Sequence, residues 1–110
     1  ITVSSMWGQI GASCEVGYSA AKAAVIGLTR GLAKELGPSG VTVNCVAPGI
    51  IQTEMNRHLS CETIDILREE TPLGRIGDPA DVAASLLFLA SPGGNFLTGQ
   101  VLAPNGGIVI

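Results

Sequence analysis

Two β-rich runs separated by a long helix-forming run constrain the fold of this chain more than any other feature of its sequence. Residues 1–4 and 41–47 are rich in β-branched residues, whereas residues 18–36 contain mostly alanine, leucine and other helix formers. A strand, a crossover helix and a second strand in this order form a parallel pair with a right-handed connection. The second run is apolar at most positions, as in strands that are buried on both faces. The sequence therefore predicts an α/β fold built on a parallel sheet.

The helix expected over residues 18–36 has two different faces. Larger apolar residues recur at three- and four-residue spacing and form one stripe: Ala21, Val25, Leu28, Leu32 and Leu36. A second flank is almost free of bulky side chains, which would let another helix approach closely: Ala20, Ala23, Ala24 and Gly27. Gly37 can adopt a left-handed conformation and precedes Pro38, and this pair predicts the end of the helix.

The rest of the chain predicts further elements. Ser60 can cap a helix that runs to about residue 70. Asp78 and Pro79 are typical of the cap and the first position of another helix. Residues 100–103 predict a last short strand, and residues 5–17 predict a polar, glycine-rich loop.

Composition and charge exclude several classes of protein. With 46% hydrophobic and only 14% charged residues, the 110 residues suit one compact domain rather than a disordered segment or a charged coiled coil. A net charge of −3 with six scattered basic residues offers no surface for nucleic acid and no polybasic membrane anchor. No apolar run is long enough to span a bilayer, and the first residues lack the basic stretch of a signal peptide.

The three cysteines, Cys14, Cys45 and Cys61, favour a cytoplasmic protein. They cannot all pair within one chain, and their wide spacing resembles no zinc-binding pattern. We therefore expect free thiols in a reducing cytoplasm and no metal site.

Tyr18 and Lys22 are candidates for acid–base chemistry. They lie four residues apart, so they share one face of the predicted helix at its first turn. A phenol is a poor acid or base at neutral pH. An ammonium roughly 5 Å away favours the phenolate by about 3 kcal/mol at an effective dielectric near 20. Such a pair also occurs by chance on a solvated helix, and the residues alone leave that reading open.

Ser5 strengthens the case for a reactive site. It ends the first β-rich run thirteen residues before Tyr18, so the intervening loop could fold back and bring the two hydroxyl groups together. A hydroxyl in that place could hold a substrate carbonyl oxygen while the phenol protonates it. Taken singly, a serine at a strand end is more often a turn or cap residue.

Five stretches resemble successive landmarks of the short-chain dehydrogenase/reductase family, in its order and at its spacings. They are the strand that ends in Ser5, YSAAK at 18–22, VNCVAPG at 43–49, LGR at 73–75 and TGQ at 98–100. The resemblance covers essentially all 110 residues. It implies the C-terminal part of a Rossmann-like, doubly wound parallel sheet in three α/β/α layers. It also implies an oxidoreductase that transfers a hydride between NADP or NAD and a carbonyl or alcohol carbon.

The resemblance implies a role for each matching residue. Ser5 would orient and polarise the substrate carbonyl, and Tyr18 would donate a proton in reduction and accept one in oxidation. Lys22 would ease deprotonation of the phenol and hydrogen-bond the nicotinamide ribose. Four residues would line the nicotinamide pocket: Pro48, Gly49, Ile51 and Thr53. The backbone of Ile51 and the hydroxyl of Thr53 would lie near the carboxamide.

The family's glycine-rich phosphate-binding loop is not among these residues. The resemblance therefore implies that residues 1–110 are a single partial domain, the catalytic half, with the phosphate-binding βαβ half upstream of Ile1. The residues that select NADP or NAD would lie upstream as well. The alternative from another class is a truncated, non-catalytic fragment that only folds or associates.

Within the family, the chain most resembles 3-oxoacyl-acyl-carrier-protein reductases, which act on a carrier-linked ketone. Those enzymes usually carry a basic residue before the glycine at position 40, where this chain has Ser39. Residues 7–16 are instead similar to elongation factor P 5-aminopentanone reductases. Glu15 could meet the positive charge of such a substrate, and Trp7 could wall its pocket. A solvated carboxylate and a cover for the sheet edge are equally open readings.

Family members commonly form dimers and tetramers through the helix that carries the tyrosine. The resemblance therefore implies a homodimer or homotetramer through residues 18–36. The other expected partner is a small-molecule or carrier-linked ketone, and neither nucleic acid nor a membrane is expected.

Overall fold

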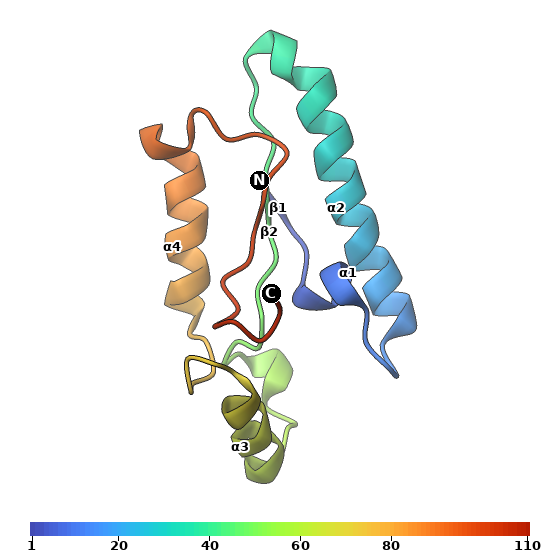
Figure 1. The fold of residues 1–110 in the computed structure, drawn as a ribbon, viewed down its shortest axis with the longest axis vertical. Coiled ribbons are helices and arrows are strands. Elements are labelled where there is room, and N and C mark those ends of the chain that lie inside the picture. Colours follow the sequence, from blue (N-terminus) through green and yellow to red (C-terminus); the bar gives the residue numbers. More distant parts are fainter.

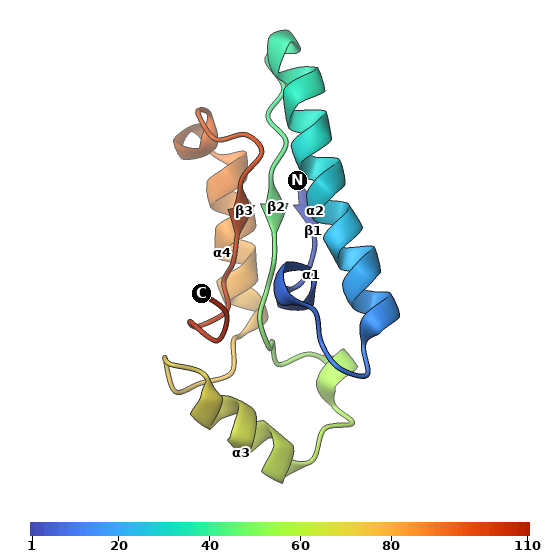
Figure 2. The ribbon, with the colours of Figure 1, turned by 45° about the vertical axis from the view of Figure 1, so that its right-hand side comes forward.

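A three-stranded parallel sheet forms the centre of the fold, in the order β1–β2–β3 (Figure 2). The computed structural model describes all 110 residues, and its strands are short: β1 (Thr2–Val3), β2 (Cys45–Val46) and β3 (Val101–Leu102). In the central strand, Cys45 pairs with Thr2 on one side and with Val101 on the other. The predicted parallel sheet is confirmed.

Backbone hydrogen bonds extend the pairing of β2 beyond its two assigned residues. The Gly99 N–H donates to the Val43 carbonyl at 2.8 Å, and the Gly49 N–H donates to the Pro104 carbonyl at 3.2 Å. Residues 43–47 are all buried, as expected for a central strand that is covered on both faces.

Helices cover both faces of this sheet. α2 (Val16–Leu36) packs along β1 and β2 on one side, and α4 (Pro79–Ala90) packs against β2 on the other (Figure 1). α1 (Met6–Ile10) and α3 (Cys61–Glu70) lie beyond the carboxyl ends of the strands (Figures 1 and 2). Three short 3₁₀ turns complete the chain: η1 (Gly37–Ser39), η2 (Glu54–Asn56) and η3 (Pro92–Gly94). Ligand sites of open α/β sheets form at the carboxyl ends of the strands, so α1 and α3 border the expected site.

The helix α1 differs from the loop that the sequence predicts over residues 5–17. It is only five residues long and has Gly8 at its centre, so its sequence carries little helical signal. Tertiary packing explains it, because Met6 is buried and a Cβ on Gly8 would lie 2.8 Å from the backbone carbonyl carbon of Lys22. Gly8 thus allows α1 to pack directly on α2.

The face of α2 that packs on the sheet also differs from the predicted apolar stripe. Its buried residues are Ser19, Ile26, Thr29 and Ala33. Leu28, a member of the predicted stripe, is 56% exposed. The two hydroxyl residues can be buried because Thr29 Oγ1 lies 2.6 Å from Thr2 Oγ1, and Ser19 Oγ accepts the Ala12 N–H at 3.1 Å. A pattern that counts only apolar residues misses such a face. The small-residue flank is exposed: Ala20, Ala23, Ala24 and Gly27.

The α-helix α2 ends at Leu36, as Gly37 and Pro38 predict, but the left-handed residue is Gly40 rather than Gly37. Gly37 keeps a helical φ of −52°, and the chain continues into η1. Gly40 is the left-handed residue, with φ 76°. Pro38 lies in the first turn of η1, where a proline is tolerated because its missing N–H has no partner to lose.

The last two helices begin where the sequence predicts. Ser60 Oγ accepts the Thr63 N–H at 3.1 Å at the start of α3. Asp78 caps α4 through a reciprocal capping box with Asp81, and Pro79 takes the first helical position. None of the helices is both long and apolar enough to cross a membrane.

Candidate active site

Ser5 lies where β1 passes into α1, and it caps that helix. Its Oγ accepts the Trp7 N–H at 3.2 Å. The hydroxyl proton has no acceptor in the structure, so it can be donated to a ligand. Ser5 can therefore cap the helix, as the sequence allowed, and still offer its hydroxyl to a substrate.

Tyr18 and Lys22 lie one turn apart at the start of α2. The Lys22 ammonium is 5.7 Å from the centre of the Tyr18 ring, and it also donates a hydrogen bond to the Val3 carbonyl at 3.2 Å. Lys22 thus links the tyrosine to the end of β1, two residues before Ser5. Tyr18 is 39% exposed, which leaves the phenol accessible. No hydrogen bond joins the hydroxyl groups of Ser5 and Tyr18 directly.

Ser4, which the sequence reading leaves out, holds β1 and α2 together. It is only 3% exposed, and its Oγ donates to the backbone carbonyl of Lys22 at 2.7 Å. This bond attaches the strand to the helix at the lysine itself. The pair of adjacent serines at the strand end is the only signal in the sequence that could have indicated it.

Pro48 and Gly49 join the central strand to neighbouring elements. The Met6 N–H donates to the Pro48 carbonyl at 3.0 Å, so this segment is attached to the turn that carries Ser5. A Cβ on Gly49 would lie 2.8 Å from the Cα of Asn105, and only glycine allows this approach.

Ile51 and Thr53 differ in exposure. Ile51 is buried and forms a parallel β-bridge with Gly77. Thr53 is exposed at the cap position of η2, and its side chain forms no capping hydrogen bond. Its hydroxyl is therefore available at the carboxyl end of the sheet. Lys22 also keeps two N–H groups beyond the one given to Val3. These free donors fit a nicotinamide carboxamide and its ribose.

The two candidate substrate residues lie on different elements. Trp7 is half-buried in α1. Glu15 is exposed at the cap position of α2, where its side chain forms neither a capping hydrogen bond nor an ion pair. A free carboxylate thus lies three residues before Tyr18.

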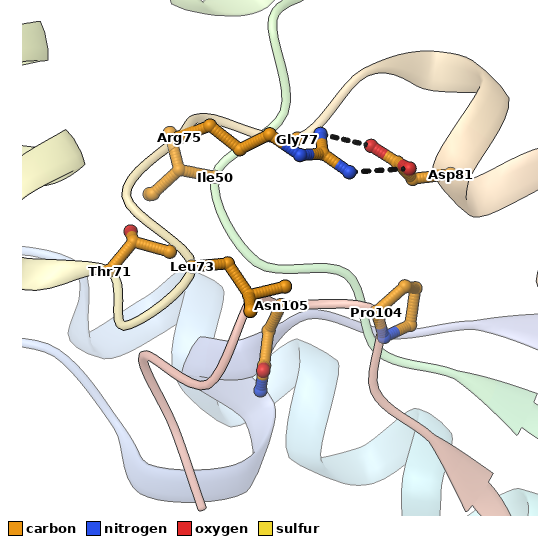
Figure 3. Close-up of a pocket in the computed structure, with 9 residues that line it drawn as sticks. Ile50, Thr71, Leu73, Arg75, Gly77, Asp81, Pro104 and Asn105 are labelled. Atoms are coloured by element: carbon orange, nitrogen blue, oxygen red, sulfur yellow. Dashed lines mark hydrogen bonds and ion pairs between the residues drawn. The ribbon is translucent and has the colours of Figure 1, made fainter.

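Two cavities adjoin the segment that follows Gly49. A cavity of about 210 Å³ is bordered by Thr53 and by apolar side chains that include Leu59 and Ile64. A second cavity, of about 230 Å³, lies beside the Arg75–Asp81 ion pair (Figure 3). Ser5, Tyr18 and Lys22 line neither cavity.

Known proteins share this sequence and this fold. A family model described as enoyl-(acyl carrier protein) reductase matches residues 1–109. The crystal structure of a short-chain dehydrogenase/reductase from Brucella melitensis, described as a glucose/ribitol dehydrogenase, matches with a TM-score of 0.94 at 39% identity. The match covers 100% of this chain and 45% of that one. The chain belongs to the short-chain dehydrogenase/reductase family.

Curated members of the short-chain dehydrogenase/reductase family resemble the chain over nearly all its length. The uncharacterized oxidoreductase YmfI of Bacillus subtilis is 46% identical over 97% of this chain and 44% of its own length. The 3-oxoacyl-[acyl-carrier-protein] reductase FabG of Vibrio cholerae is 44% identical over 98% of this chain and 44% of its own length. The chain therefore spans less than half the length of these relatives.

Membership of the short-chain dehydrogenase/reductase family confirms the resemblance inferred from the five landmark stretches. It also confirms the predicted fold class, a Rossmann-like α/β fold with helices on both faces of a parallel sheet.

Proposed function

We propose that residues 1–110 are the catalytic half of an NAD(P)-dependent oxidoreductase that transfers a hydride between nicotinamide and a carbonyl or alcohol carbon. The observation that carries the proposal is the position of Lys22, 5.7 Å from the centre of the Tyr18 ring and 3.2 Å from the Val3 carbonyl. A phenol and an ammonium are thereby tied to the strand end that carries the Ser5 hydroxyl, a set of groups suited to proton transfer. NADP or NAD, when bound, supplies the hydride.

Each residue has a distinct step in this proposal. In reduction, Ser5 donates a hydrogen bond to the substrate carbonyl oxygen and orients it. Tyr18 transfers its proton to that oxygen as the carbon receives the hydride, and the Lys22 ammonium stabilises the phenolate that remains. In oxidation, the phenolate accepts the alcohol proton. The free N–H groups of Lys22 would hold the nicotinamide ribose, and the Ile51 backbone and the Thr53 hydroxyl would hold the carboxamide.

The other half of the cofactor site would be a phosphate-binding βαβ unit that precedes these residues. Two observations support this arrangement. The relatives are more than twice as long as the part that matches this chain. In addition, β1 is an edge strand, and Val3 is 46% exposed, so a further strand could pair with it.

The substrate class that we favour is a ketone linked to a carrier as a 3-oxoacyl group. The names of several relatives, such as the FabG proteins, support this class. The free carboxylate of Glu15 favours a second candidate, a ketone with a positive charge, as in the elongation factor P 5-aminopentanone reductases. Turnover of a neutral ketone and of an amine-bearing ketone separates the two. If Glu15→Gln lowers turnover of the amine-bearing ketone alone, the second candidate is supported.

Tyr18→Phe tests the proposed chemistry in the full-length enzyme. Because the variant lacks the proton donor, we expect turnover of a generic diketone to fall by at least about a hundredfold. Cofactor binding should change far less, since the ring remains. Steady-state kinetics and a cofactor titration provide the two readouts. Turnover near that of the wild type would remove Tyr18 from the mechanism and would favour the non-catalytic alternative.

A homodimer or homotetramer through α2 is supported by its exposed small-residue flank, which would let a second helix approach closely. Leu28 borders this flank and is 56% exposed. We expect Leu28→Glu to lower the molar mass of the full-length protein in light scattering, because a carboxylate would be buried at the contact. The exposed free thiols of Cys14 and Cys61 suit a reducing cytoplasm.

A further inference from the structure

The segment that joins α3 to α4 runs beside the proposed carboxamide-binding loop. The Gly77 N–H donates to the Ile50 carbonyl at 2.9 Å, and the Gln52 N–H donates to the Gly77 carbonyl at 2.8 Å. Gly77 thus pairs with Ile51 as a short parallel strand would. The backbone of Ile51, which is proposed to contact the cofactor, is held on one side by Gly77.

This pairing leaves little room for a side chain at position 77. A Cβ on Gly77 would lie 2.5 Å from Ile51 Cδ1 and 3.3 Å from the Ile50 carbonyl oxygen. Ile51 itself is buried. Gly77 and the residues on either side of Ile51 are therefore joined by both backbone bonds and close contact.

The Arg75–Asp81 ion pair fixes the residues that precede and follow Gly77 in the chain. Arg75 donates two hydrogen bonds to the Asp81 carboxylate, at 2.7 and 2.9 Å (Figure 3). The same carboxylate accepts the Asp78 N–H at 2.8 Å. Asp81 lies in the first turn of α4, so the residue two positions before Gly77 and the residue after it are both attached to that helix. A bidentate guanidinium–carboxylate contact sets orientation as well as distance.

Close packing is incomplete around Arg75 and Gly77. A cavity of about 230 Å³ is bordered by Arg75, Gly77 and Asp81 on one side and by Asn105 on the other (Figure 3). Leu73 is 69% exposed, although Ile76 in the same segment is half-buried. Atoms beside a void lose contacts on that side. The position of the segment therefore depends on its polar bonds.

We infer that Arg75 and Asp81 are positioning residues for the nicotinamide. Together they hold Gly77 against Ile51 and so fix the position of the Ile51 backbone, which is proposed to contact the carboxamide. This inference rests on the proposed function, which assigns Ile51 and Thr53 to the cofactor.

The test is the affinity for cofactor in the full-length enzyme. We expect Arg75→Met to raise the cofactor KM and Kd by about tenfold to a hundredfold, the scale of small misplacements in an active site. The KM for the ketone should stay within about twofold, because the substrate groups of the site do not contact this segment. A purely structural role would reduce the amount of folded enzyme and leave the cofactor KM unchanged. Arg75→Lys keeps the charge without the bidentate contact and should restore part of the affinity.

Asp81→Asn provides a second variant that keeps an acceptor for the Asp78 N–H, and it should raise the cofactor KM in the same way. Arg30→Met is the control, since it removes an exposed arginine of α2 that has no ion pair in the structure and should leave the cofactor KM unchanged. If Arg75→Met does not fold, Arg75→Lys and Asp81→Asn decide the question. A wild-type cofactor KM in a folded variant of either residue overturns the inference. The Tyr18→Phe result is independent of this outcome, so failure of the proposed function would be recognised separately.

Discussion

At the residue scale, Ser5 and Lys22 each stabilise the backbone while they keep a hydrogen-bond donor free. Ser5 accepts the Trp7 N–H as a helix cap and keeps its own proton free. Lys22 donates to the Val3 carbonyl and keeps two N–H groups free beside Tyr18. Because these bonds fix the two side chains, the positions of the free donors are set before any ligand binds, as the proposed proton transfer requires.

A single residue, Asp81, makes the stability of the fold depend on pH. The hydrogen bonds from Arg75 and from the Asp78 N–H lower the pKa of the Asp81 carboxyl from 3.8 to about 2. The unfolded chain therefore takes up this proton at a higher pH than the folded one does. Asp81 contributes stability that is present above about pH 4 and is lost as the pH falls toward 2.

We therefore expect wild-type protein to be more stable than Asp81→Asn at neutral pH, with a difference that shrinks between about pH 4 and pH 2. Thermal unfolding of both proteins across this range is the measurement. The difference should be modest and should fall with added salt, because the pair is partly exposed. Unfolding temperatures that stay equally far apart down to pH 2 would contradict the lowered pKa of Asp81.

At the scale of elements, the packing of α1 on α2 determines where Ser5 lies relative to Tyr18. Gly8 allows this contact, since a Cβ there would lie 2.5 Å from Ser4 Oγ and 2.8 Å from the Lys22 carbonyl carbon. Ser4 also bonds the Lys22 carbonyl. A methyl group added at Gly8 would therefore push α1 away from α2 and from Ser4.

Gly8→Ala tests this role of the α1–α2 contact. We expect it to lower the free energy of unfolding by about 1–3 kcal/mol, the usual cost of overpacking. Gly17→Ala on α2 is the matched control, because nothing lies within 4 Å of the added methyl group, and its effect should be within about 0.5 kcal/mol. Chemical denaturation of the two variants provides the comparison. Equal effects would show that α1 can move aside without cost.

At the scale of the whole molecule, a large amount of apolar surface is uncovered. Phe96 and Ile110 are almost completely exposed, and Leu87 is 72% exposed. The edge strand β1 and the small-residue flank of α2 are uncovered as well. Exposed large apolar side chains of this number are typical of a protein whose surface other parts of an assembly cover.

We therefore expect the isolated 110-residue chain to self-associate or to remain poorly folded, and to bind no nicotinamide cofactor measurably. Light scattering and a cofactor titration on the purified chain are the measurements. A well-folded monomer that binds NAD(P)H would contradict the proposal that these residues are one half of an enzyme.

Local chemistry allowed much of this molecule to be predicted from its sequence. The parallel sheet follows from the order of β-rich and helix-forming runs, and the starts of α3 and α4 follow from Ser60 and Asp78, whose side chains bond N–H groups two or three residues away. The family follows from short stretches that keep their order and spacing. The candidate residues Ser5, Tyr18 and Lys22 are identified in the same way, and their roles remain predictions.

Tertiary structure alone decided the features that depend on partners distant in sequence. α1 exists because Met6 is buried and Gly8 meets α2, although its own sequence favours no helix. The inner face of α2 includes Thr29 because Thr2, 27 residues earlier, supplies a partner for its hydroxyl. The support of Ile51 by Gly77 joins segments 26 residues apart in the chain. Burial and hydrogen bonding are satisfied by whichever residues the fold brings together, and a local pattern does not contain that information.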